Sequence, residues 1–121
     1  MFTQEERVEL IRRVTGDLPN VEIDSPNELL AEYARRRGSC VIVKGLRAVS
    51  DFETEFQMAL INHKINSELD TMFLTADSQY MYLSSSMVKE LGTYGVDLSD
   101  LLPSEIIPDF QERIENRKQH F

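Results

Sequence analysis

Two short stretches of this sequence carry side chains that could bind phosphate. The first, Lys44-Gly45-Leu46-Arg47, places two cations around a glycine. The second, Ser84-Ser85-Ser86, places three hydroxyl groups in a row. Cations and the backbone N–H groups at a helix start are groups with which proteins hold phosphate oxygens. Both stretches are therefore candidate anion-binding sites, and the elements around them must hold them in place.

The cationic stretch joins a predicted strand to a predicted helix. Residues 40–43 are small, apolar and mostly β-branched, which favours a strand buried on both faces. Ser50 and Glu53 have the spacing of a capping box, which predicts a helix that ends near Asn66. A cationic turn between such a strand and helix is a common phosphate site at the carboxyl end of a parallel sheet. An ordinary β–α connection with two solvated cations is the alternative.

The three serines are predicted to open a later helix, after a strand over residues 72–75. One serine at such a position needs no function, since serine is a common N-cap residue. Three together add hydroxyls to the N–H groups that a helix start leaves without intrahelical partners. This arrangement suits an anion.

The N-terminal third of the chain predicts two helices and a strand. Thr3 with Glu6 is a capping box for the first helix. Residues 20–24 are expected to form a short strand. The segment Ser25-Pro26-Asn27-Glu28 predicts the start of the second helix, whose last turn holds Arg35-Arg36-Arg37. Three cations there suit the helix dipole, and a nucleic-acid contact is the alternative.

Composition indicates one small globular domain. Hydrophobic residues make up 41% and charged residues 28% of the 121 residues, and we expect a single domain over residues 1–121. A net charge of −8 disfavours a nucleic-acid partner, although a nucleotide needs only a local group of cations.

The single cysteine, Cys40, allows no internal disulfide, which favours a cytoplasmic protein. No apolar run approaches membrane-spanning length, so no membrane partner is expected. A final helix follows Pro103, and its charged end, residues 112–121, is expected to fray.

The two candidate anion sites together resemble those of the bacterial phosphopantetheine adenylyltransferases. Residues 44–55, KGLRAVSDFETE, are similar to the family segment R-G-L-R-A-x-x-D-F-E-x-E. Residues 80–86, YMYLSSS, are similar to its W-x-x-I-S-S-S segment. The opening residues 1–7 are similar to the start of its second helix, and the match runs to about Pro103. The resemblance implies an α/β fold, a doubly wound, Rossmann-like nucleotidyltransferase domain.

The resemblance also implies roles for the residues at matching positions. Lys44 and Leu30 would contact phosphopantetheine, and Arg47 would contact the phosphates of ATP. Lys44 stands where the family has arginine, so the charge is kept but the bidentate fork is lost. Mg²⁺ is the implied cofactor, and no residue of this chain is assigned to it. The implied nucleotide-binding set is Gly45, Leu46, Arg47, Glu55, Tyr80, Met81, Tyr82, Leu83, Ser84, Ser85 and Ser86.

One family feature has no match in these residues. The family begins with a strand, a turn that carries a G-x-F-D-P-x-x-x-G-H motif, a helix and a second strand. Neither histidine of this chain, His63 or His120, stands in such a motif, so no catalytic residue is assigned. In the family strand order 3-2-1-4-5, the two unmatched strands would leave a gap of about 14 Å between strand 20–24 and its remaining neighbours. We therefore expect an N-terminally truncated domain in which Met1 is an internal methionine.

The implied function is transfer of AMP from ATP to 4′-phosphopantetheine, which gives dephospho-coenzyme A and pyrophosphate. The implied partners are ATP, phosphopantetheine or coenzyme A, and further copies of the chain, since the family forms hexamers. Without the histidine motif, we expect no measurable transfer by the 121 residues alone. Two alternatives stay open: another adenylyl- or cytidylyltransferase of the superfamily, and a non-catalytic nucleotide-binding or assembly module.

Overall fold

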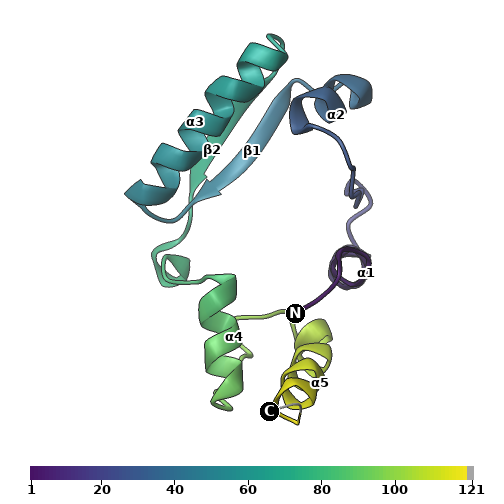
Figure 1. Cartoon of the computed structure of the whole chain (residues 1–121), viewed down its shortest axis with the longest axis vertical. Helices are drawn as coiled ribbons and strands as arrows, with labels where there is room; N and C mark the ends of the chain where they lie inside the picture. Colours follow the sequence, from purple (N-terminus) through teal and green to yellow (C-terminus); the bar gives the residue numbers. More distant parts are fainter. Residues whose placement is uncertain (120–121) are drawn as a thin grey trace. The chain divides into compact units, whose positions relative to one another are not determined.

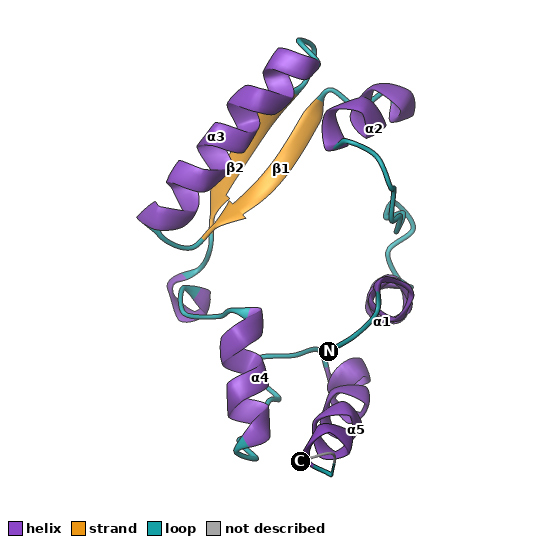
Figure 2. Ribbon diagram, viewed as in Figure 1, coloured by secondary structure: helices purple, strands orange, loops and turns teal. Residues whose placement is uncertain are grey.

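The computed structural model describes residues 1–119, and of Val49 and Ser50 it describes the backbone alone. The described chain divides into two compact units, Pro26–Tyr82 (unit 2) and Met1–Ser25 with Leu83–Phe121 (unit 1), and each is described by itself. That the two make one domain stays a prediction. The elements in chain order are α1 (Gln4–Thr15), α2 (Leu30–Arg37), β1 (Val41–Leu46), α3 (Val49–Ile65), β2 (Asp70–Thr75), the 3₁₀ helix η1 (Ser78–Tyr80), α4 (Ser85–Thr93), the 3₁₀ helix η2 (Ser104–Ile106) and α5 (Ile107–Lys118) (Figures 1 and 2).

Unit 2 is built on a parallel pair of strands. The register places Val41 opposite Asp70 and Leu46 opposite Thr75. Helix α3 connects the two strands and packs against both (Figure 2). Parallel strands need such a crossover, because a tight turn can join only antiparallel ones. The α/β prediction is confirmed, and the predicted strand 72–75 begins two residues earlier, at Asp70.

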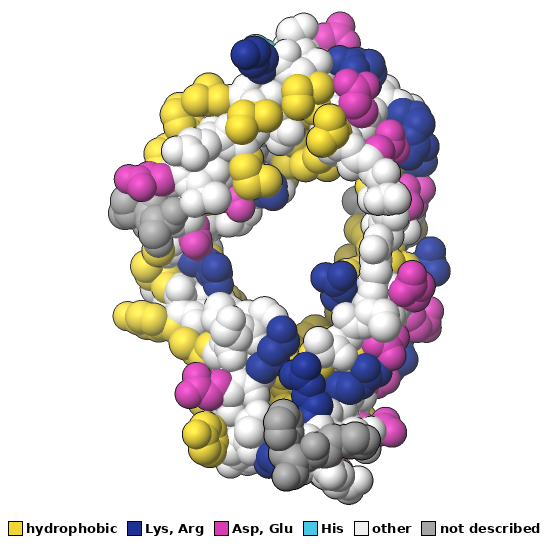
Figure 3. Space-filling view, viewed as in Figure 1, with side chains coloured by type: hydrophobic (Ala, Val, Ile, Leu, Met, Phe, Trp, Pro, Cys, Tyr) yellow, Lys and Arg dark blue, Asp and Glu magenta, His cyan; other side chains and the backbone are white. Residues whose placement is uncertain are grey.

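One face of this sheet is bare among the described residues. Phe73 faces α3 and makes an edge-on ring contact with Phe52, with 5.7 Å between the ring centroids. On the opposite face, four apolar side chains are 45–59% exposed, and Figure 3 shows hydrophobic side chains gathered over the strands of unit 2. The prediction of a strand buried on both faces is wrong here, because helix α3 covers one face only. We call the four residues the bare sheet face: Val41, Val43, Met72 and Leu74.

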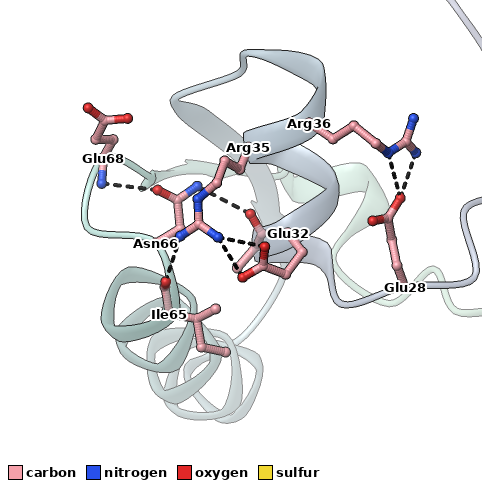
Figure 4. Close-up of polar contacts among 8 residues, drawn as sticks. Glu28, Glu32, Arg35, Arg36, Ile65, Asn66 and Glu68 are labelled. Atoms are coloured by element: carbon pink, nitrogen blue, oxygen red, sulfur yellow. Dashed lines mark hydrogen bonds and ion pairs between the residues drawn. The ribbon is translucent and has the colours of Figure 1, made fainter.

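A buried amide joins α2 to the end of α3. Asn66 is 3% exposed, and its Nδ2 donates to the carbonyl oxygen of Ala31 at 3.2 Å (Figure 4). Its Oδ1 accepts from the backbone N–H of Glu68, also at 3.2 Å (Figure 4). Both ends of the amide are thus satisfied, which a buried polar group requires. Beside it, Ala31 and Leu69 form the small core of unit 2 with Ala34.

Two of the three arginines in α2 are engaged within unit 2. Arg35 donates to the carbonyl oxygen of Ile65 at 2.8 Å and pairs with Glu32 (Figure 4). Arg36 pairs with Glu28, with 2.5 Å between Nη2 and Oε1 (Figure 4). The positions of Arg35 and Arg36 are therefore accounted for by contacts within unit 2, and neither requires a nucleic-acid partner.

Two predictions just before α2 are wrong. Residues 20–24 form no strand; the Val21 N–H bonds instead to the carbonyl oxygen of Leu18, in a turn. Helix α2 begins at Leu30, five residues after the predicted N-cap Ser25. The hydroxyl of Ser25 accepts a hydrogen bond from Gln4. The side chain that the local pattern predicted to cap α2 therefore makes a contact with a distant residue instead.

Unit 1 packs α4 against α5. Its buried core is Val88, Leu98, Phe110 and Ile114. A Cβ atom at Gly92 would lie 2.5 Å from the Cδ1 of Ile114 and 2.8 Å from the Cε1 of Phe110, so a larger residue would force these core side chains to shift. Because Phe110 and Ile114 are buried, α5 continues to Lys118, and the prediction that the chain frays from residue 112 is wrong for the described residues. No helix of the described chain is long and apolar enough to cross a membrane.

The predicted capping box of α1 is confirmed, and it is tied to α5. The Thr3 side chain accepts from the Glu6 N–H, and the Glu6 carboxylate accepts from the Thr3 N–H at 2.7 Å. Arg113 of α5 donates to the other carboxylate oxygen of Glu6 and stacks over the ring of Phe2. The hydrogen bond from Arg113, and then that from Thr3, lower the pKa of Glu6.

We predict that Glu6→Gln removes a pH-dependent part of the stability. Because the pKa of Glu6 is lowered on folding, its contribution is full above the unfolded pKa of about 4.3 and is lost as the pH falls through the folded value. Thermal melts between pH 7 and pH 3 should show wild type and E6Q differing most at pH 7 and converging in acid. Glu9→Gln, an exposed change on the same helix, is the control. A gap between wild type and E6Q that does not change with pH would contradict the prediction.

We also predict that the polypeptide self-associates through the bare sheet face. Four exposed apolar side chains on one sheet face favour burial against a second copy. Size-exclusion chromatography should show species larger than 14.0 kDa, and Val43→Lys with Leu74→Lys should reduce them. Gln57→Lys, on exposed α3, is the matched control. A monodisperse 14.0 kDa species with a sharp cooperative melt would refute the prediction.

Candidate functional site

A pocket of about 600 Å³ lies at the carboxyl ends of β1 and β2. The strand register brings these two ends to the same level, and Ala76 N–H extends the pairing by donating to the carbonyl oxygen of Leu46 at 2.8 Å. Ligands of parallel α/β sheets bind at this end. The pocket is lined by Leu46, Arg47, Ala48, Phe52, Thr75, Ala76 and Met81.

The lining of the pocket combines apolar walls with one cation. Leu46, Phe52 and Met81 offer flat or flexible apolar surface, and Arg47 is the charged residue among the lining groups. The volume falls within the range of roughly 300–1,000 Å³ that is typical of small-molecule sites. Such a lining suits a ligand with an apolar ring at one end and negative charge at the other.

Arg47 is held by the first turn of α3. Its Nε lies 3.1 Å from the Oδ2 of Asp51, and both side chains are partly exposed. Arg47 leaves the end of β1, and Ala48 occupies the N-cap position of α3. The N-cap therefore lies two residues before the predicted cap at Ser50, whose side chain lies outside the described residues.

Lys44 and Glu55 form a second ion pair between β1 and α3. The Lys44 Nζ lies 3.4 Å from the Glu55 Oε2. That oxygen is shielded from solvent and accepts no hydrogen bond from the described residues, so the lysine is its charged neighbour. Lys44 lies within β1, which runs to Leu46, although the sequence predicted that the strand would stop at residue 43.

Gly45 has open space where a side chain would be. A Cβ atom built on Gly45 would meet no described atom within 4 Å, and its φ is not positive. Neither backbone conformation nor packing inside this structure therefore calls for glycine. Gly45 is not among the residues that line the pocket, and strand alternation sets it on the same face as Val43. A glycine in a strand commonly marks close approach of a ligand or of another backbone.

The aromatic segment after β2 contributes one side chain to the pocket. Met81 lines it, directly after η1, whose start is capped by Asp77. Tyr80 is half-exposed, and Tyr82 is 78% exposed. Of the predicted segment 80–82, the structure thus brings only Met81 to the pocket lining.

The serine stretch opens α4, as predicted, in unit 1. Ser84 is the N-cap residue, and its hydroxyl accepts from the N–H of Met87 at 3.1 Å. Ser85 and Ser86 are exposed in the first turn, with Leu83 just before it. Their N–H groups and hydroxyls suit an anion, which stays a prediction.

Leu30, predicted to contact phosphopantetheine, lies outside the pocket lining. It is the first residue of α2 and is 38% exposed. The described residues contain no group of three or more potential metal-binding side chains.

Sequence reasoning missed part of this site. Thr75 and Ala76 follow the second strand, and the rule that parallel strands end at one edge could have found them. Asp51 could have been found from its spacing of four residues from Arg47. The pocket position of Phe52 could not be predicted from the sequence, since its spacing indicated only the apolar face of a helix.

A family model and two relatives match most of this chain. A model of the cytidylyltransferase-like family matches residues 1–91. The phosphopantetheine adenylyltransferase of Finegoldia magna is 47% identical over 116 residues, which are 96% of this chain and 72% of that protein. The protein of the same name from Clostridium botulinum strain 657 is 44% identical over 119 residues, 98% of this chain and 73% of that protein.

The chain belongs to the phosphopantetheine adenylyltransferase family. The resemblance read from the two phosphate-type segments is thereby confirmed, as is the nucleotidyltransferase class. Membership gives no ligand to individual residues of this chain, so the assignments of Lys44, Arg47 and the serine stretch stay predictions.

We predict that Gly45→Ala weakens nucleotide binding without harming the fold. The new methyl group meets nothing within 4 Å, and alanine in a strand is no worse than glycine. Thermal melting should be unchanged or slightly raised, whereas ATP affinity by calorimetry should fall. Thr54→Ala, on exposed α3, is the control. Unchanged ATP affinity in G45A would remove Gly45 from the site.

Proposed function

We propose that this chain serves the transfer of AMP from ATP to 4′-phosphopantetheine, which gives dephospho-coenzyme A and pyrophosphate. The observation that carries the proposal is the identity of 44–47% with proteins of that name, over 96–98% of this chain. The pocket at the carboxyl ends of β1 and β2 supports it, since it joins apolar walls to a guanidinium group.

The roles follow from the chemistry of the pocket. Leu46, Phe52 and Met81 would hold the uncharged part of ATP, and Arg47 would meet its phosphates. Lys44, two residues before the end of the same strand and outside the pocket lining, would meet the phosphate of phosphopantetheine, as the family resemblance implies. The substrate phosphate attacks the α-phosphorus of ATP, a new P–O bond forms, and pyrophosphate leaves with the bonding electron pair. The protein's own contribution is position and positive charge.

Mg²⁺ belongs to the proposal only as a companion of ATP. Protein sites for Mg²⁺ use carboxylates together with substrate phosphates and water. Near lining residues in the chain, the carboxylates of Asp51 and Glu55 pair with Arg47 and Lys44, and that of Asp77 caps η1. The described residues therefore do not fit a resident Mg²⁺ site. A cytoplasmic location and a homo-oligomeric assembly are further parts of the proposal.

We predict that the 121-residue polypeptide alone shows no measurable adenylyl transfer, and that the family's G-x-F-D-P-x-x-x-G-H segment restores it. One preorganised donor is typically worth about 10²–10³ in rate, and the histidine of that motif is not among these residues. Pyrophosphate release with ATP, Mg²⁺ and phosphopantetheine measures the activity, with the segment supplied in cis or as a peptide.

The control is the same segment with its histidine replaced by alanine, which should restore no turnover. Robust turnover by the 121 residues alone would refute the role given to the motif. No turnover with the intact segment would favour a non-catalytic nucleotide-binding module instead.

A further inference from the structure

We propose that Asp51 is a positioning residue that orients the Arg47 guanidinium for the phosphates of the nucleotide. This inference rests on the proposed function, because it concerns how the same pocket holds its anion. Asp51 is not itself among the residues that line the pocket, but it contacts Arg47, which is. It acts through Arg47.

The contact is specific in its geometry. The Asp51 Oδ2 lies 3.1 Å from the Nε of Arg47, which is one edge of the guanidinium rather than its terminal nitrogens. A guanidinium is planar and rigid, so a carboxylate that holds the Nε edge also sets the plane of the group. Bidentate recognition of phosphate depends on that plane, because two parallel N–H groups must point at two oxygens.

A purely structural role accounts poorly for the pair. The Arg47 and Asp51 side chains are 41% and 32% exposed, and ion pairs this exposed contribute little to folding. Asp51 also lies in the first turn of α3, where a carboxylate suits the helix dipole. The dipole would be served by an acid at any of the first helical positions, whereas the contact with Nε needs this one.

Removing the charge of Asp51 distinguishes two roles for this residue. If its charge alone matters, ATP affinity should rise, and if it positions Arg47, ATP affinity should fall. A carboxylate beside a phosphate site repels the ligand, so neutralising it should tighten ATP binding if charge is all that matters. Loss of the Asp51 contact should weaken binding instead, because less of the guanidinium's orientation is then set before the ligand arrives. The direction of the change therefore decides between them.

The experiment is calorimetric titration of ATP into the full chain and its variants. Asp51→Asn should weaken binding by about three- to tenfold, and Arg47→Ala by roughly tenfold or more. Glu53→Gln, which removes an equal charge two residues along the same helix, should leave the affinity unchanged or slightly raised. Asp51→Glu, which keeps the carboxylate, should recover part of the loss. Adenosine, which lacks phosphates, should bind wild type and D51N equally.

A double-mutant cycle separates action through Arg47 from action on the helix. In the Arg47→Ala background, Asp51→Asn should cause no further loss. An equal loss in both backgrounds, a loss of adenosine affinity, or unchanged or tighter ATP binding by D51N would each overturn the positioning role. If D51N does not fold by circular dichroism, the comparison of D51E with wild type carries the same test. ATP binding that is lost in R47A but kept in D51N would overturn the positioning role and leave the proposed function standing. A wild-type chain that binds no ATP would overturn both.

Discussion

The parallel pairing of β1 with β2 is the constraint on which the candidate site depends. The register sets Leu46 opposite Thr75, so both strands end at the same level and the segments that leave them line one pocket. A shift of one residue in β1 would turn every side chain to the other face. Lys44 would then leave Glu55 of α3 and point to the bare sheet face. The ion pair and the pocket therefore both report on the same register.

Both cations of the candidate site are held by carboxylates of α3. Asp51 and Glu55 stand four residues apart, one turn of the helix, and they meet Arg47 and Lys44 respectively. In a chain with a net charge of −8, this pairing costs some attraction for an anion, since each cation is partly neutralised. In return each cation is held near the end of the sheet before the ligand arrives, and Arg47 is held by a hydrogen bond. Preorganised charge is worth more to a transition state than mobile charge, because it needs no rearrangement during the reaction.

Sequence reasoning succeeded where the signal is local. The capping box of Thr3 and the N-cap Ser84 lie within four residues of the groups they bind, and both are confirmed. It failed where a distant partner decides. Residues 20–24 have a strand-like composition but form no strand, and Ser25 bonds to Gln4 instead of capping α2. The pocket divides differently: Leu46, Arg47 and Met81 were implied by the resemblance of their segments to the family, whereas Thr75 reaches the site only through strand pairing.

The lysine at position 44 changes how this site would hold its second substrate. An arginine at this place, as in the family pattern, could meet both oxygens of Glu55 with two parallel N–H groups. Lys44 instead presents a compact ammonium 3.4 Å from one buried oxygen, which it approaches without forming a hydrogen bond. An ammonium has three donors that rotate freely about the end of a flexible stem, so its hold on Glu55 leaves it able to turn toward a phosphate. The orientation of that phosphate then cannot come from Lys44 and must come from groups with fixed geometry. Of Lys44 and Arg47, only Arg47 carries a planar guanidinium group with parallel N–H donors. In the proposed function, the alignment of the ATP phosphates with the phosphate of phosphopantetheine would therefore depend on the orientation of Arg47.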